Sequence, residues 1–190
     1  MVANSPHKEA LKTQLREAYG RIVYTYTTHL KKMNLLDKNN LLIKYAQIIL
    51  SAISTGGFIG SMITNQLVLT VVGGIFSTVL LVLNLFFRDF NLVEESRQHR
   101  IASDNLWLIR EQYISLLTDF EILSEDDIIA KRDDLQRLTF DVYNKSPKTD
   151  AKSYVAAQKA LKSEEEQFFK PEEIDMMLPA HLRITTMSDK

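Results

Sequence analysis

Residues Tyr45–Thr64 read YAQIILSAISTGGFIGSMIT and residues Leu67–Phe87 read LVLTVVGGIFSTVLLVLNLFF, without a charged side chain in either run. Each run has about 20 residues, the length that an α-helix needs to cross ~30 Å of hydrocarbon. Two adjacent runs of this length are rare in soluble domains, which disfavours a pair of buried helices in a soluble protein. Only Asn65 and Gln66 separate the runs, so the two helices must be antiparallel neighbours. The sequence therefore predicts a transmembrane hairpin.

The average composition conceals this hairpin. Of 190 residues, 45% are hydrophobic and 25% are charged, which are ordinary values for a soluble protein. Lys and Arg number 23 against 24 Asp and Glu, so the net charge gives no reason to expect direct binding of nucleic acid. The chain has no cysteine, which excludes a disulfide framework and a thiolate metal site.

The flanks of the two runs predict their orientation. Lysines precede the first run and arginines follow the second, whereas the connecting turn carries no charge. These basic residues are Lys31, Lys32, Lys38, Lys44, Arg88, Arg97 and Arg100. By the positive-inside rule, both termini are expected in the cytoplasm and the turn on the far side of the membrane.

Polar and small side chains recur along one face of each predicted span. The polar positions follow steps of three, four or seven residues, which place them on a common helix face. They are Gln47, Ser51, Ser54 and Ser61 in the first span, and Thr70, Ser77 and Asn84 in the second. Small residues that allow close helix packing are Gly56, Gly57, Gly60, Gly73 and Gly74.

These stripes have two interpretations. They pack the hairpin, with polar groups hydrogen-bonded between its helices, or one stripe lines an aqueous path when several hairpins assemble. Asn84 is the strongest pore-lining candidate, because its amide is the most polar group of the second span. Neither span contains Asp, Glu, Lys, Arg or His, which argues against a proton relay or an ion-coupled transporter.

Long amphipathic helices are predicted on both sides of the hairpin. The first starts at Ser5-Pro6 and runs for seven or eight turns, with a break expected near Asn34 or Asn39-Asn40. After the second span, apolar residues alternate in steps of four and three, as in a coiled-coil seam. The seam comprises Ala102, Leu106, Ile109, Tyr113, Leu116, Phe120 and Leu123. The predicted fold class is therefore an all-α membrane protein, a two-helix transmembrane hairpin flanked by long cytoplasmic amphipathic or coiled-coil helices.

The remaining chain is predicted to form shorter helices. Ser124 and Asp150 have the character of helix caps, and Pro171 that of a first-turn residue. Apolar residues near the end, including Met176, Met177 and Leu182, are expected to dock on the helical bundle. We divide the chain into a two-span domain over residues 1–144 and a cytoplasmic helical tail over residues 145–190.

No pattern of catalytic or metal-binding residues is present. The sequence has no phosphate-binding loop, nucleophile elbow or zinc-protease motif. The four histidines, His7, His29, His99 and His181, lack ligand spacing and are interpreted as surface or packing residues. We therefore expect no enzyme activity, no metal and no cofactor.

This order of elements resembles the SLATT family, the two-span effector domains of bacterial conflict systems. The resemblance rests on EALKTQLREAYGRIVYTYTTHLKKM, residues Glu9–Met33, on its continuation into the hairpin and on the step Ser54-Thr55-Gly56-Gly57. It covers roughly residues 6–144. It implies an oligomeric effector in the bacterial inner membrane that acts in anti-phage defence. Implied partners are the lipid bilayer, further copies of the chain, and a sensor protein, a nucleotide-signal synthase or a reverse transcriptase.

Two functions remain open at this stage. The first is an oligomer that forms a pore or disrupts the membrane when triggered, causing abortive infection. The second is a membrane-anchored scaffold that recruits a cytosolic partner through its coiled coil and through exposed charges such as Arg110.

Overall fold

The computed structural model describes residues 6–64, 66–89 and 91–184, and these residues form helices without any β-strand. The helices are α1 (Pro6–Thr64), α2 (Leu67–Asp89), α3 (Leu92–Thr118), α4 (Glu125–Lys145), α5 (Ala151–Lys162) and α6 (Pro171–Met177), followed by a short 3₁₀ turn, η1 (Ala180–Leu182). The predicted all-α fold with two helices long enough to span a membrane is confirmed.

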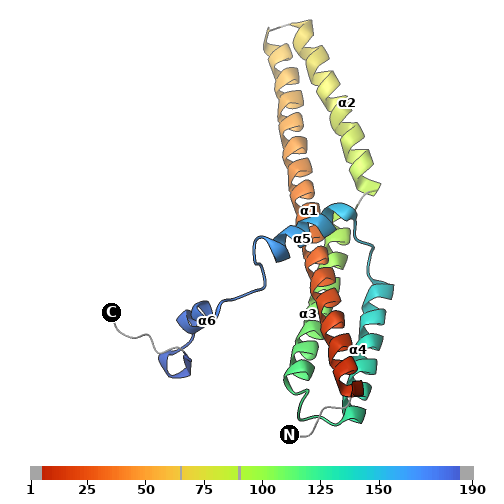
Figure 1. Ribbon diagram of the computed structural model, residues 1–190. Coiled ribbons are helices and arrows are strands. Elements are labelled where there is room, and N and C mark those ends of the chain that lie inside the picture. Colours follow the sequence, from red (N-terminus) through yellow and green to blue (C-terminus); the bar gives the residue numbers. More distant parts are fainter. Residues whose placement is uncertain (1–5, 65, 90, 185–190) are drawn as a thin grey trace.

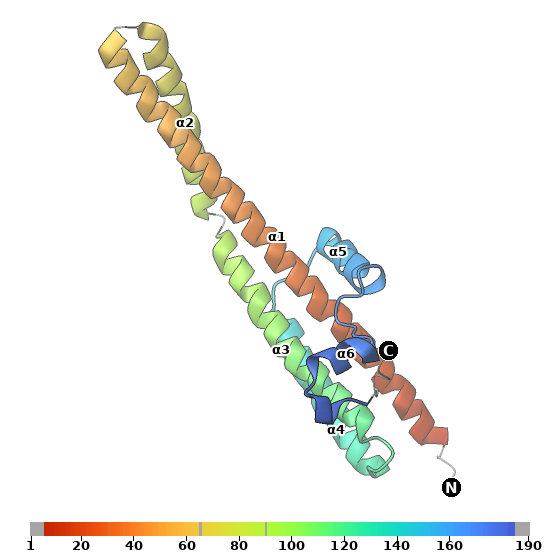
Figure 2. The same cartoon turned by 90° about the vertical axis from the view of Figure 1, so that its left-hand side faces the viewer.

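The molecule is elongated and has two parts that share α1 (Figure 1). At one end α2 folds back along the second half of α1, and we call residues 45–64 of α1 together with α2 the hairpin. At the other end α3 and α4 lie along the first half of α1, and α5 packs across it (Figure 2). We call residues 6–44 of α1 together with α3, α4 and α5 the bundle.

Helix α1 continues without a break from the bundle into the hairpin, so the expected interruption near Asn34 or Asn39-Asn40 is wrong. An Asn inside a helix costs less than about 1 kcal/mol relative to Ala. Packing on α3 outweighs that cost: Leu36 is buried, and Asp37 accepts a hydrogen bond of 2.5 Å from the Ser96 hydroxyl of α3. The start at Pro6 agrees with the prediction, whereas Ser5 lies outside the described residues.

The bundle core lies between α1, α3 and α4. Its apolar side chains come from the predicted seam of α3, from the face of α1 that it meets, and from α4. The buried members are Leu11, Leu15, Ala18, Ile22, Leu106, Ile109, Tyr113, Leu116, Phe120, Ile128 and Leu135, and Leu123 packs against them. Helix α3 ends at Thr118, so Phe120 and Leu123 reach the core from the turn that leads to α4.

Local signals placed the later helices correctly. The Ser124 hydroxyl accepts from the backbone N–H of Asp127, the Asp150 carboxylate accepts from that of Ser153, and Pro171 opens α6. The predicted docking of the tail is wrong. Met176 and Met177 of α6 are 68% and 66% exposed, because their short helix stands away from the bundle (Figure 1).

Candidate functional site

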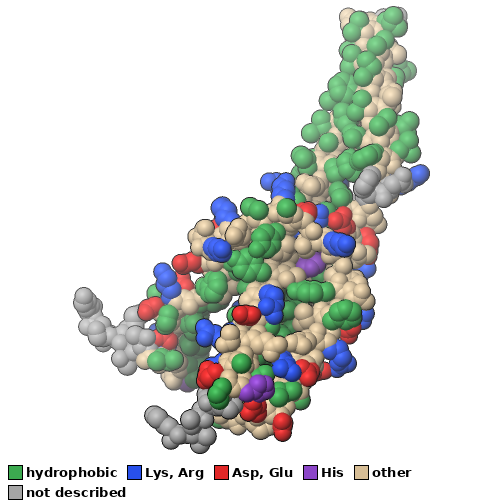
Figure 3. All heavy atoms as spheres, turned by 45° about the vertical axis from the view of Figure 1, so that its right-hand side comes forward, with side chains coloured by type: hydrophobic (Ala, Val, Ile, Leu, Met, Phe, Trp, Pro, Cys, Tyr) green, Lys and Arg blue, Asp and Glu red, His purple; other side chains and the backbone are tan. Residues whose placement is uncertain are grey.

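The hairpin surface is apolar almost everywhere. In the most apolar window of each long helix only 6% of the residues are buried, whereas the core helix of a soluble protein would be mostly buried. Exposed side chains include Met62 at 85% and Ile63 at 79%. In Figure 3 hydrophobic side chains cover the hairpin, and the charged ones gather on the bundle. This surface suits lipid and not water.

Polar groups join the two helices of the hairpin along its length. Near the bundle, the Gln47 amide donates to Oδ1 of Asn84 at 2.9 Å. In the middle, the buried Ser54 hydroxyl donates to the carbonyl oxygen of Gly73 at 3.1 Å. Near the turn, the hydroxyls of Ser61 and Thr70 hydrogen-bond to each other. The predicted polar stripes therefore face each other at these positions.

Two glycines allow the helix backbones to touch. A Cβ atom on Gly57 would lie 3.1 Å from the carbonyl oxygen of Leu69 and 3.2 Å from Cα of Gly73. A Cβ on Gly73 would lie 3.1 Å from the carbonyl oxygen of Ser54, and one on Gly60 would meet only the Leu69 side chain, at 3.3 Å. Any larger residue at Gly57 or Gly73 forces the helices apart, since the neighbouring atoms belong to the backbone.

Other members of the stripes lie outside this contact. Gly56 and Gly74 have open space where a Cβ would be, and Ser51 and Ser77 are exposed. An open groove of about 760 Å³ is lined by residues that include Ser51 and Gly56 of α1 and Leu80 and Asn84 of α2, whereas Gly74 and Ser77 do not line it. The hairpin thus satisfies part of its polar stripe internally and presents the rest on an open surface.

Comparison with known proteins decides the family. The model of the SMODS and SLOG-associating 2TM effector domain, family 4, matches residues 11–173. The chain belongs to this SLATT family. No curated protein and no solved structure matches the sequence.

Family membership and the apolar hairpin together make this SLATT chain a membrane protein with two transmembrane helices. Membership also supports a role as a membrane effector of a conflict system, and SLATT effector domains are not known as enzymes. The match extends beyond Asn144 and includes α5, whose buried face lies on α1. The division of the SLATT chain at residue 144 stays a prediction.

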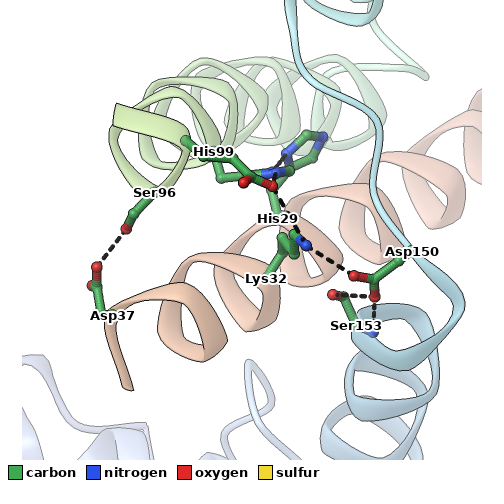
Figure 4. A network of polar contacts seen from close by, with 8 residues as sticks. His29, Lys32, Asp37, Ser96, His99, Asp150 and Ser153 are labelled. Atoms are coloured by element: carbon green, nitrogen blue, oxygen red, sulfur yellow. Dashed lines mark hydrogen bonds and ion pairs between the residues drawn. The ribbon is translucent and has the colours of Figure 1, made fainter. Parts of the chain in front are cut away.

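A buried polar cluster in the SLATT bundle was missed from the sequence. His29 of α1 and His99 of α3 are 3% and 0% exposed, and their Nδ1 atoms are 2.8 Å apart (Figure 4). Beside them Lys32 donates to Asp150, the N-cap of α5, at 2.9 Å and lies 3.5 Å from Glu95 of α3. The signal was present in the periodicity: His29 follows Ile22 and Tyr26 on the buried face of α1, and His99 precedes Ala102 in the seam.

Burial sets the titration of this cluster. Removal from water disfavours a charged imidazole, and together with the neighbouring His99 it lowers the pKa of His29 to about 4. Burial also lowers the pKa of His99, against the opposite effect of Glu95. The Ser153 backbone N–H and hydroxyl, with Lys32, hold the pKa of the Asp150 carboxyl well below its usual range. Near neutral pH both imidazoles are therefore uncharged, and Asp150 is ionised.

Proposed function

We propose that this chain is an oligomeric effector of the bacterial inner membrane that opens a pore, or disrupts the membrane, when a partner triggers it in anti-phage defence. Its bundle and both termini lie in the cytoplasm, because basic residues flank the hairpin on that side and the opposite turn has none. Toxicity to the infected cell then stops the phage.

The observation that carries this proposal is the polar surface that the hairpin leaves uncovered. Ser51 and Thr55 of α1 are exposed beside Asn84 of α2. Asn84 uses its carbonyl oxygen for Gln47, so the two N–H groups of its amide remain to be bonded by other groups. Polar groups that face hydrocarbon cost free energy. Assembly of several hairpins covers them or places them along water.

The test is membrane potential, read with a dye in bacteria during induction. We compare wild type, Asn84→Leu, and the double variant Gln47→Leu/Asn84→Leu, which removes both partners of the hydrogen bond. Both variants are expected to depolarise the membrane at least severalfold more slowly, because the polar path loses its amides. The matched control is Thr78→Leu, since the Thr78 hydroxyl bonds the Gly74 carbonyl of its own helix; it should behave like wild type.

The double variant separates a pore from simple packing. If Gln47 and Asn84 serve only to hold the hairpin together, replacing both with Leu restores packing and leaves depolarisation at the wild-type rate. That result would remove the pore-lining role of Asn84. Absence of depolarisation in infected cells that carry the complete defence system would count against a pore altogether.

A scaffold is the second candidate, and exposed apolar side chains on α3 favour it. Ile101, Trp107 and Leu108 are 44%, 48% and 53% exposed on the bundle, where a partner helix would cover them. Arg110 is a poor site for a charge reversal that tests this, because its side chain is only 15% exposed. Arg100 and Asp104 are exposed on the same helix. If the chain is a scaffold, Asp104→Arg should abolish protection of the bacteria against phage, and the membrane potential should stay unchanged in wild type and variant alike.

The trigger is proposed to be a separate protein. The family description names association with SMODS and SLOG domains. A sensor protein or a nucleotide-signal synthase agrees with that description, and a reverse transcriptase is the further alternative. Contact with the exposed α3 surface would allow any of them to act on the bundle.

A further inference from the structure

His29 and His99 form the polar centre of the contact between α1 and α3. They lie 70 positions apart in the chain, and both rings are almost completely buried. With 2.8 Å between the two Nδ1 atoms, one nitrogen must carry a hydrogen and the other must accept it. The two neutral rings are therefore in opposite tautomers, joined by one N–H···N hydrogen bond.

Counting protons shows how this contact responds to acid. A first added proton binds an Nε2 atom and leaves the Nδ1 hydrogen bond in place. A second one has to bind the accepting Nδ1 atom, after which two N–H groups and two positive charges face each other. The doubly protonated pair has no hydrogen bond and repels itself, so the rings must separate.

The surrounding charges fit this two-step response. Three charged side chains act on the pair: Glu95 of α3, 3.9 Å from His99, and the ion pair between Lys32 of α1 and Asp150, the N-cap of α5 (Figure 4). They amount to one positive charge against two negative ones. A single added proton balances them. Two added protons leave an excess of positive charge in a site where Nε2 of His99 is buried without a hydrogen-bond partner among the described residues.

We propose that His29 and His99 form a proton-operated latch, closed at neutral pH and opened by acid, between the membrane-proximal parts of α1 and α3. The latch holds the two helices that continue toward the hairpin, α1 directly and α3 through its start at Leu92. This inference concerns the conformation of the bundle and does not depend on whether the hairpin conducts ions.

The direction of the pH dependence follows from the lowered pKa values. The pKa of His29 is about 4 when α1 and α3 are packed and about 6.5 when they are apart. Packing therefore favours the neutral rings, and the neutral pair makes its full contribution to holding α1 against α3 above about pH 6.5. This contribution falls as the pH falls from about 6.5 to about 4, and below about pH 4 it falls no further.

The experiment measures a distance in the full chain in liposomes. Nitroxide labels are attached at Asn34→Cys on α1 and Arg100→Cys on α3, two exposed positions in a chain without cysteine. Distances between the labels are recorded by pulsed electron resonance at several pH values between 7.5 and 3.5. The wild-type background should show a longer distance in acid, with a ratio of open to closed molecules that changes about tenfold per pH unit for each proton bound.

Variants that cannot charge both rings decide the outcome. His29→Gln and His99→Gln each leave one imidazole with an amide partner, so the short distance should persist at every pH. The control is His181→Gln, an exposed histidine outside the bundle, which should follow wild type. The latch is refuted if wild type keeps its short distance down to pH 3.5, or if both glutamine variants open as wild type does. The neutral-pH distance of each variant checks that its bundle is folded.

Discussion

At the scale of single residues, Gly57 and Gly73 determine how closely the helices of the hairpin approach. Each occupies a place where a Cβ atom would lie 3.1–3.4 Å from backbone atoms of the other helix. Backbone atoms cannot rotate away as a flexible side chain does. The carbonyl groups brought close by these glycines include that of Gly73, which accepts from Ser54. Close approach and hydrogen bonding therefore depend on one another here.

We predict that Gly57→Leu separates the hairpin helices, whereas Gly56→Leu does not. Overpacking of this kind costs typically about 1–3 kcal/mol, and it also breaks the hydrogen bond from Ser54. Thermal unfolding in detergent, followed by circular dichroism, measures the loss of stability. Gly56 is the matched control, one position away and open to space. Equal melting temperatures for the two variants would show that the close contact is not needed.

The sequence predicted the glycines of the hairpin as a set, but it did not predict which of them contact the opposite helix. Spacing shows that residues share a helix face, and it does not show how far each helix is rotated about its own axis. The same gap applies to the histidines: each lies on a periodic buried face, yet only tertiary packing brings His29 to His99. Residue patterns therefore could not predict which residues far apart in the chain contact each other.

At the scale of secondary-structure elements, α5 fastens the connection after α4 onto α1. Asp150 caps α5 through the Ser153 backbone and also binds Lys32 of α1. Tyr154 stacks on Tyr24 with 5.9 Å between ring centroids. The small residues Ala157 and Ala160 are fully buried, so the helix lies close on its neighbour.

We predict that a chain ending after Asn144 depolarises membranes at a lower expression level than the full chain. Loss of α5 leaves Lys32 without Asp150 and uncovers a face of α1, which weakens the bundle that restrains the hairpin. The dye assay for membrane potential gives the threshold of expression.

The control for this truncation is a chain that ends after Phe169, which removes α6 and keeps α5. Because Met176 and Met177 of α6 are exposed, its threshold should equal that of the full chain. If both truncations shift the threshold by the same amount, length and not α5 is responsible. Local caps predicted the start of α5, but its docking on α1 carries no local signal.

At the scale of the whole molecule, the sequence predicted the hairpin and the flanking helices because apolar length and periodicity are properties of each segment alone. It did not predict that α1 passes uninterrupted through Asn39 and Asn40. There, weak local preference against a helix competes with burial of Leu36 and the bond from Ser96 to Asp37. Tertiary contacts decide such a balance.

We predict that Asn39→Pro disconnects the two parts of the molecule without removing either. Proline inside a helix costs about 3 kcal/mol and bends it, because a backbone hydrogen bond is lost and the ring clashes with the preceding turn. Because the bundle no longer restrains the hairpin, depolarisation should begin at a lower expression level and respond at least tenfold less to the trigger, while extraction of membranes with alkaline carbonate still leaves the protein in the pellet. Asn39→Ala, which favours the helix, should act as wild type; equal activity of the proline variant would show that no signal travels through α1.

The continuity of α1 also has a mechanical consequence. A helix of 59 residues is a rod of roughly 90 Å, at 1.5 Å per residue. The return path differs, because α2 ends at Asp89 and α3 starts afresh at Leu92 with Asn91 as its cap. The two parts of the molecule are thus joined by one continuous helix and by one interrupted path. We expect that a partner that turns the bundle half of α1 about the helix axis also turns the half of α1 in the hairpin.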